Sequence, residues 1–339
     1  MTTRPRAKAK KSPSPARRKG ARPVKTRKRK APPPGERLKV AILSRKASLY
    51  STSRLVEAVR AHGHEALVLD TLRCDLLAEK GRPKIYYEGE ELSGISVVLP
   101  RIGASITRYG LAVVRQLESM GVPALNGSDG ISRSRDKLRC IQLLAQAGID
   151  VPRTVMMRER AHLEGAVDRI GGLPVIVKLL QGTQGVGVML AHSFDELESM
   201  LDTMWNLEQE ILLQEFVAES RGRDVRALVV GDRVVGAMRR TARVQGEFRS
   251  NIHRGGLGEL IELPESFARE AVRAARVVGL EVAGVDLLES SSGPRIAEVN
   301  SSPGIEGLER ASGVDVAEAI VAHAIRLATS TPPPHSPRS

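Results

Sequence analysis

The 339-residue chain has few cysteines, no long apolar run and, near its beginning, almost no acidic residues. Its two cysteines, Cys74 and Cys140, do not make a disulfide framework, and they suit a reducing cytoplasm, which is the expected location. No apolar stretch reaches the roughly 18 residues of a membrane-spanning helix, so we expect no membrane partner. The basic N-terminal segment also lacks the apolar core of a secretory signal.

Acidic residues are scarce in residues 1–37, which hold 15 lysines and arginines but a single acidic residue, Glu36. This segment carries a charge of +14, and since the whole chain carries +13, the rest is close to neutral at −1. It is rich in proline and poor in apolar side chains, which predicts a disordered tail. The tail has three interpretations: a solubilising extension, an arm that attracts RNA or another polyanion, or a transit peptide.

Strands and helices alternate in residues 38–135. Apolar segments predict three buried strands, at 38–44, 65–70 and 95–103, and helical spacing predicts helices at 53–63 and 107–120. This alternation is typical of a parallel sheet covered on both faces. The turn after the first strand has no G-x-G-x-x-G pattern, so this domain is interpreted as a scaffold or substrate platform rather than a dinucleotide site.

A second unit is predicted over residues 136–327, followed by a flexible tail at 328–339. It begins with an amphipathic helix at 136–147. The elements that follow are strands at 174–180 and 187–192, a helix at 194–206, a strand at 210–217, a hairpin that turns at Gly231 and Asp232, a helix at 265–279, strands at 282–289 and 294–300, and a helix at 314–327.

The segment KLLQGTQGVGV places Lys178 just before Gly182, Gly185 and Gly187. A Walker loop has its lysine after the glycines, so this segment is not one. Because both flanks have the pattern of strands, we expect a β-hairpin whose tip has bare, mobile amide groups. Successive N–H groups form a nest for anionic oxygens, and Lys178 adds a positive charge at the root of the loop. An ordinary flexible hairpin is the alternative.

The segment VAGVDLLESSSGPRIAEVN predicts two apolar strands joined by a Ser/Gly turn. If the turn centres near residue 292, Asp286 lies opposite Glu298, and Asn300 points the same way as Glu298. The residues expected to face the core are then Val285, Leu287, Ala297 and Val299. Two opposed carboxylates repel each other, and a divalent cation such as magnesium, bound together with nucleotide phosphates, removes the repulsion. The alternative is an exposed hairpin with incidental acids.

These features resemble the ATP-grasp superfamily, and in particular the RimK-type ribosomal-protein glutamate ligases. The matching motifs lie between residues 39 and 327 and are KVAILSR, PRIGASITRYG, RDKLR, VVGDRVV, FRSNIHRGG, AGVDLL and EVNSSPGIEGLE. Many ATP-grasp ligases share the last motif, whereas FRSNIHRGG together with PRIGASITRYG is more specific to RimK and its relatives. The resemblance implies an α/β chain in which an ATP-grasp fold of two subdomains follows a small parallel-sheet pre-ATP-grasp domain.

The resemblance also implies roles for single residues. ATP would be clamped between the two subdomains, with a hinge near residues 214–217. The implied ATP contacts are Lys137, Lys178, Gly182, Gly185, Gly187, Gln214, Glu215, Phe216, Val217, Asp224, Arg249 and Asn251. Two Mg²⁺ or Mn²⁺ ions would be held by Asp286, Glu298 and Asn300. Lys178 and Arg249 are the candidate catalytic residues, since phosphoryl transfer depends on charge neutralisation.

Two further residues are candidates for binding substrate. Arg101 lies near the end of a predicted sheet strand and is a candidate for holding a substrate carboxylate, with an ordinary surface arginine as the alternative. His253 lies in one of the matching motifs, which implies a position in the lining of the site.

In the implied reaction, a carboxylate takes the γ-phosphoryl group of ATP, and an amine then displaces phosphate to form an amide. We therefore expect a cytoplasmic, homo-oligomeric ligase that adds glutamate to the C-terminal carboxylate of a small-subunit ribosomal protein. Two alternatives stay open: a ligase for a small amino-acid or peptide substrate, and a nucleotide-sensing RNA-binding protein without ligase activity. The intact lysines and metal ligands count against the second.

Overall fold

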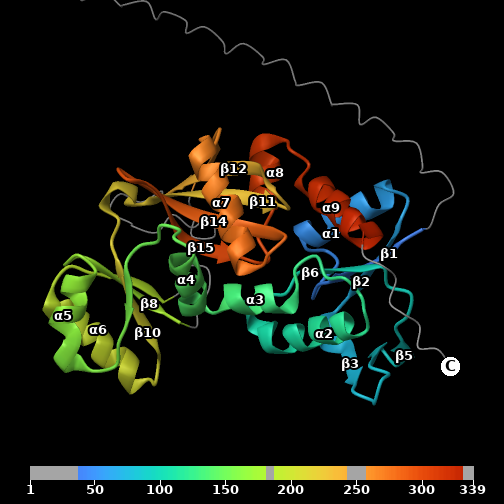
Figure 1. Cartoon of the computed structure of the whole chain (residues 1–339), viewed down its shortest axis with the longest axis horizontal. Coiled ribbons are helices and arrows are strands. Elements are labelled where there is room, and N and C mark those ends of the chain that lie inside the picture. Colours follow the sequence, from blue (N-terminus) through green and yellow to red (C-terminus); the bar gives the residue numbers. More distant parts are fainter. Residues whose placement is uncertain (1–36, 181–186, 243–256, 331–339) are drawn as a thin grey trace, which may run out of the picture.

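The computed structural model describes residues 37–180, 187–242 and 257–330. Within these residues the strands form four sheets, and three of them take up successive segments of the chain (Figure 1). None of the described helices combines the length and the apolar character that a membrane crossing requires.

The first sheet consists of β1 (Lys39–Leu43), β2 (Glu65–Leu69) and β6 (Val97–Pro100), in the order β2-β1-β6. Both pairings are parallel, as the alternation of strands and helices predicted. Successive side chains of a strand point to opposite faces. For this reason Val40 and Ile42 join one core, whereas Ala41 and Leu43 join another.

Helices cover both faces of this sheet. On one face α1 (Tyr50–Ala61) packs against α9 (Val316–Ser330), and α2 (Thr107–Ser119) lies on the other. Figure 1 shows α9, in red, beside the blue α1, so the cover is completed by the far end of the chain. One core therefore joins the first sheet to the C-terminal part of the molecule.

Two parts of this region have no counterpart in the sequence-based prediction. A small antiparallel sheet is formed by β3 (Cys74–Leu77), β4 (Lys84–Tyr87) and β5 (Glu90–Glu91). The short helix α3 (Ser128–Arg135) precedes α4 (Lys137–Gln146). Both are short, and the sequence of α3 is mostly polar, so neither has the apolar periodicity on which such predictions depend.

The second sheet has the order β7-β10-β8-β9 and is antiparallel. Its strands are β7 (Thr154–Met156), β8 (Val175–Leu179), β9 (Val188–Ala191) and β10 (Ile211–Glu215). Helices α5 (Leu163–Arg169) and α6 (Phe194–Asn206) pack on it around a core of their own. Lys178 lies opposite Val188 across β8 and β9, so the predicted hairpin is confirmed.

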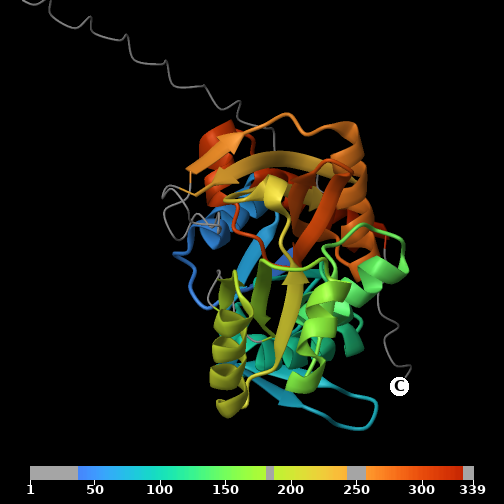
Figure 2. The same ribbon diagram turned by 90° about the vertical axis from the view of Figure 1, so that its left-hand side faces the viewer.

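The third sheet has the order β13-β12-β11-β14-β15 and is antiparallel throughout. Its strands are β11 (Arg223–Val230), β12 (Arg233–Thr241), β13 (Leu257–Leu260), β14 (Val282–Ser290) and β15 (Gly293–Asn300). The predicted turn between β11 and β12 is confirmed, with Gly231 at a φ of 63°. In the turned view of Figure 2 this sheet, in yellow to red, lies above the second sheet.

Helices also cover the third sheet. On one face α4 and α7 (Glu265–Val278) share a core with its strands. On the other face α8 (Glu306–Ser312) packs against β12 and β13 and contributes Leu308 to the core shared with the first sheet. The strands of the third sheet therefore carry buried apolar residues on both faces.

Candidate functional site

The hairpin of β14 and β15 brings together the three residues predicted to bind metal. Asp286 lies directly opposite Glu298, and Asn300 follows on β15. The prediction of inward-facing residues is partly wrong, because a β-bulge after Asp286 shifts the register: Ile296 is buried, and Ala297 is only half-buried. A bulge adds one residue to one strand, which strict alternation does not foresee.

Both carboxylate oxygens of Asp286 are held by arginines of the same sheet. Arg226, directly opposite on β11, donates from Nε to Oδ1 and from Nη2 to Oδ2, both at 2.6 Å. Arg240 on β12 approaches Oδ2 of Asp286 at 3.0 Å and donates to both oxygens of Asp224 at 2.6 Å. These two arginines and two aspartates form a charge-balanced set across the third sheet, called here the arginine–aspartate row.

The row fixes the charge state of Asp286. Burial alone would raise the pKa of Asp286, but the charges of Arg226 and Arg240 outweigh it and hold that pKa below its ordinary value. Asp286 therefore stays ionised at neutral pH. Sequence analysis missed both arginines; the signal for Arg226 is its spacing of two from Asp224, which puts both side chains on one face of β11.

Glu298, in contrast, is exposed and forms no ion pair or hydrogen bond with the residues that the structure describes. Its charge acts on Lys178, Lys137 and Arg135. Burial lowers the pKa of both lysines, and Glu298 is the largest influence in the opposite direction. The structure thus brings together the two lysines predicted to contact phosphates and one of the predicted metal ligands.

The two lysines come from different sheets. Lys178 lies on β8 of the second sheet, and Lys137 begins α4, which packs on the third. Nζ of Lys137 donates to the carbonyl oxygen of Leu180 at 2.8 Å, which joins α4 to the segment after β8. At the other end of the glycine segment, Gly187 has a φ of 76°, and a Cβ there would lie 2.6 Å from Cδ1 of Leu179. The positive φ and this close contact both favour glycine at position 187.

The predicted hinge begins with two residues whose side chains are already engaged. Nε2 of Gln214 donates to Oγ1 of Thr154 at 2.8 Å. Glu215 accepts from Nε of Arg153 at 3.0 Å and from Nη1 of Arg295 at 2.8 Å. Burial opposes the charge of Glu215, but these arginines lower its pKa to about 2. The contact of Glu215 with Arg295 ties the second sheet to the third, whereas the side chain of Gln214 is engaged within the second sheet.

The other predicted ATP contacts fall into three groups. Phe216 and Val217 follow β10, the first half-buried and the second buried. Asp224 is part of the arginine–aspartate row, where it accepts from Arg240. The predicted site residues outside the described part of the chain are Gly182, Gly185, Arg249, Asn251 and His253.

Asp286, Glu298 and Asn300 fit a divalent cation whose coordination another molecule completes. No described residue forms a hydrogen bond with the buried amide nitrogen of Asn300, so the amide can turn its oxygen toward an ion. No group of three or more His, Cys, Asp or Glu side chains in the described ranges could hold a metal by itself. Mg²⁺ is typically held by one or two carboxylates together with phosphate oxygens, and this set of donors is of that kind.

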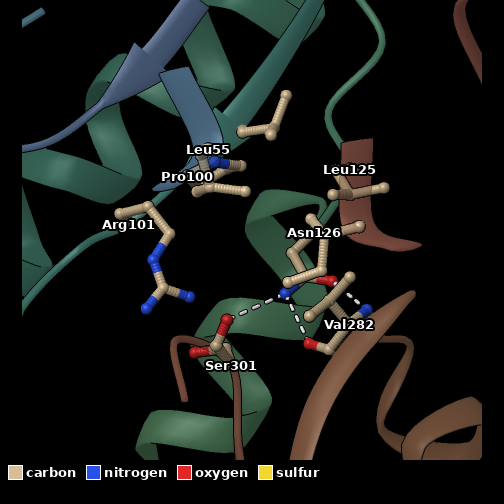
Figure 3. A pocket seen from close by; sticks show the side chains of 9 residues that line it. Leu55, Pro100, Arg101, Leu125, Asn126, Val282 and Ser301 are labelled. Atoms are coloured by element: carbon tan, nitrogen blue, oxygen red, sulfur yellow. Dashed lines mark hydrogen bonds between the residues drawn. The ribbon is translucent and has the colours of Figure 1, made fainter. Parts of the chain in front are cut away.

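Arg101 lies where the first sheet meets the loop after β15. Its Nη2 donates to the carbonyl oxygen of Pro303 at 2.6 Å, and it lines a small pocket together with Ser301 (Figure 3). Asn126, which sequence analysis missed, crosses the same pocket and donates to the carbonyl oxygens of Val282 and Ser301, both at 2.8 Å. These contacts fix the first domain against the strands of the predicted metal site.

Comparison with known proteins places these features in a family context. A model of the RimK PreATP-grasp domain matches residues 38–131, and a model of the RimK-like ATP-grasp domain matches residues 134–324. The "Probable alpha-L-glutamate ligase" of Rhodopirellula baltica is 54% identical over 84% of this chain and 70% of its own. Its counterpart in Thioalkalivibrio sulfidiphilus is 53% identical over 84% of this chain and 94% of its own.

Solved structures share the fold at low sequence identity. The ATP-grasp ligase PsnB, complexed with a minimal precursor, has a TM-score of 0.68 at 22% identity and covers 86% of this chain and 99% of PsnB. The RimK domain protein ATP-grasp from Sphaerobacter thermophilus has a TM-score of 0.63 at 24% identity, over 85% of this chain and 99% of its own. Another PsnB structure holds Mg and ADP. The predicted ATP-grasp fold with a preceding pre-ATP-grasp domain is confirmed.

Proposed function

Because the chain belongs to the RimK-like ATP-grasp family, we propose that it is an ATP-dependent ligase that joins glutamate to a carboxylate of an acceptor. The observation that carries the proposal is that the charge of Glu298, a carboxylate without an ion pair among the described residues, acts on both Lys178 and Lys137. Phosphoryl transfer needs positioned charge more than it needs a proton-transferring side chain, and this arrangement supplies positioned charge.

In the proposed reaction, the acceptor carboxylate attacks the γ-phosphorus of ATP, ADP leaves, and an acyl phosphate forms. The amino group of glutamate then attacks the acyl carbon, phosphate leaves with the electron pair of the broken bond, and the nitrogen loses a proton to give the amide. Lys178 and Lys137 hold phosphate oxygens in this scheme. Both lysines are desolvated, so a bound polyphosphate stabilises their protonated form.

Asp286, Glu298 and Asn300 are the proposed ligands of two Mg²⁺ or Mn²⁺ ions. When bound, such ions would neutralise phosphate charge and orient the transferred group. Arg226 and Arg240 hold Asp286 ionised and in one orientation. Glu298 has no partner within the described residues from which an ion would have to displace it.

The remaining assignments stay predictions within this proposal. The backbone of residues 214–217 would contact the adenine, and the segment with Gly182 and Gly185 would cover the phosphates. Arg249 would neutralise charge on the acyl phosphate, and Asn251 would contact the nucleotide. The division into domains at 38–135 and 136–327 is supported by the two separate family matches.

The proposed acceptor is the C-terminal carboxylate of a small-subunit ribosomal protein, modified in the cytoplasm by a homo-oligomer of this chain. The RimK-specific motifs FRSNIHRGG and PRIGASITRYG support this choice of acceptor. The charge of +14 on residues 1–37 supports an attraction to ribosomal RNA through counterion release.

A direct test incubates the protein with ATP, Mg²⁺, glutamate and purified small-subunit ribosomal proteins. We expect ADP release, with mass increments of one glutamate residue each on an acceptor. Glu298→Ala should abolish both signals, whereas Glu262→Ala, at an exposed position between β13 and α7, should leave them intact. ADP release only with small amino acids or peptides would identify the small-substrate ligase instead, and no ADP release with any acceptor would contradict the ligase.

A further inference from the structure

Two arginines that form no ion pair with a carboxylate of the described residues lie where the first sheet meets the loop after β15. Arg101 directly follows β6, and Arg135 is the last residue of α3. Nη2 of Arg101 donates to the carbonyl oxygen of Pro303, and Nη2 of Arg135 donates to that of Ile102, both at 2.6 Å. Because Ile102 is the chain neighbour of Arg101, both guanidinium groups lie around one short segment.

This pair differs from the arginines of the arginine–aspartate row. Arg226 and Arg240 each donate to an aspartate, whereas Arg101 and Arg135 form no ion pair with any carboxylate in the described part of the chain. Burial lowers the pKa of Arg101 to about 10, with the charge of Arg135 as the second cause, and burial also lowers the pKa of Arg135. Two like charges are held close together and partly out of water, which is unfavourable until an anion joins them.

Unused hydrogen-bonding groups surround the pair. Each guanidinium has several N–H donors, and Nε of Arg135 is buried with no hydrogen-bond partner among the residues that the structure describes. The hydroxyl groups of Ser301 and Ser302, in the loop that Arg101 contacts, are also buried and have no partner in the described part of the chain. Ser301 and Arg101 line the same pocket (Figure 3). These N–H and O–H donors lack an acceptor among the described residues, and an anion with two oxygens would supply one.

We propose that Arg101 and Arg135 together bind a carboxylate of a substrate. The assignment rests on the proposed ligase function and extends it, because it names the residues that recognise a substrate and adds Arg135 to the predicted Arg101. The planar fork of a guanidinium matches the two oxygens of a carboxylate. The position also suits the reaction, because Glu298 acts electrostatically on Arg135 as well as on Lys137 and Lys178. The two arginines therefore lie near the proposed phosphate and metal site.

Two substrates carry such a carboxylate: the incoming glutamate and the C-terminus of the acceptor. Calorimetry on the full chain, with a nonhydrolysable ATP analogue and Mg²⁺ present, separates them with three probes. The probes are L-glutamate, the peptide Ala-Ala-Glu, and the same peptide with a C-terminal amide. The two peptides differ only in the terminal carboxylate, and no probe requires ligation to be observed.

Arg135→Gln is expected to weaken the binding of one carboxylate probe by about ten- to a hundredfold, the effect of losing a charge-assisted hydrogen bond. Arg135→Lys keeps the positive charge but not the planar pair of N–H donors, so it should weaken the binding of the same probe by less. Affinity for the ATP analogue should be unchanged. Arg133→Gln, at an exposed position of the same helix, is the control and should bind all probes as the wild type does.

A loss for glutamate alone identifies the incoming amino acid as the ligand, and a loss for the free peptide but not its amide identifies the acceptor. Equal affinities of Arg135→Gln and Arg133→Gln overturn the proposal, as does a wild type that binds no probe, or a loss confined to the ATP analogue. If Arg135→Gln does not fold, Arg135→Lys and Arg101→Lys decide by the same criteria. A wild type that binds the probes but forms no amide contradicts the proposed function and leaves this site standing.

Discussion

Two groups of charged side chains lie next to each other in this molecule and are built in opposite ways. In the arginine–aspartate row, two arginines and two aspartates satisfy one another across the third sheet. The second group, called here the cationic cluster, has four cations and one carboxylate. Its members are Arg101, Arg135, Lys137, Lys178 and Glu298.

The two groups differ in whether they need another molecule to balance their charge. A balanced, buried set of charges is complete without any other molecule and stabilises the arrangement that it belongs to. A set with excess positive charge, partly removed from water, becomes favourable only when a ligand brings the missing negative charge. In the proposed function, the row therefore holds Asp286, one of the proposed metal ligands, in place, and the cationic cluster would receive the nucleotide and the substrate carboxylate.

The largest expected effect comes from breaking the row. Arg240→Met leaves Asp224 without the arginine that contacts both of its oxygens, and it removes one of the two arginines on Asp286. The expected loss in the free energy of unfolding is about 3–5 kcal/mol, as for other buried pairs that lose one partner. Urea denaturation measures it, with Arg233→Met, at an exposed position of the same strand, as the control. A loss below about 1 kcal/mol would mean that the row is not structural.

The next effect belongs to the cationic cluster and should appear in activity alone. Glu298→Gln is expected to lower the rate of ADP release by about 10²- to 10³-fold, as for other groups that stabilise a charged transition state. The free energy of unfolding should change by no more than about 0.5 kcal/mol, because Glu298 has no partner among the described residues. Glu262→Gln is the matched control. A large loss of stability in Glu298→Gln would place Glu298 in the structural class instead.

A smaller effect is an increase in the free energy of unfolding, expected when Lys178 is replaced. Burial lowers the pKa of Lys178, so its charge opposes folding in the absence of ligand. Lys178→Met should raise the free energy of unfolding by about 1 kcal/mol while it weakens nucleotide binding, a trade-off that is common at functional sites. Thermal unfolding with and without an ATP analogue measures both quantities, and Lys80→Met, at an exposed lysine, is the control. A destabilised Lys178→Met would contradict the account of the cluster.

The smallest effect concerns the balanced contacts of the hinge. The pKa of Glu215 lies at about 2, below the ordinary 4.5, so its contribution to stability is present above pH 4.5 and is lost as the pH falls toward 2. The contribution should be about 1 kcal/mol, because water reaches Arg153 and screens the pair. Acid unfolding of Glu215→Gln should depend less steeply on pH than that of the wild type, or of Glu164→Gln at an exposed position. Identical curves would show that the ion pairs contribute nothing.

The local parts of the site were predictable from the sequence. A turn near residue 292 fixes the register of its hairpin, and register decides which side chains face each other, so Asp286 opposite Glu298 followed from counting. The glycine-rich hairpin was predictable in the same way, because apolar strands flank it. The bulge at Ala297 was not, since an extra residue in one strand leaves no mark in the apolar pattern.

The long-range parts were not predictable. Arg101 and Pro303 are 202 residues apart, and no local pattern links them. Asn126 donates to Val282 on β14 and to Ser301, just after β15, which are 156 and 175 residues away, and α9 covers a sheet formed by the first strands. Such contacts depend on how whole domains pack, so the pairing of Arg101 with Arg135, which carries the substrate proposal, emerges only in three dimensions.

One crystal structure with a nonhydrolysable ATP analogue and magnesium tests the central claim most directly. The account predicts phosphate oxygens within hydrogen-bond distance of Nζ of Lys178 and of Lys137, and a magnesium ion between the phosphates and Glu298. A nucleotide bound elsewhere, with both lysines and Glu298 in contact only with water, would contradict the claim that the cationic cluster is the ligand site.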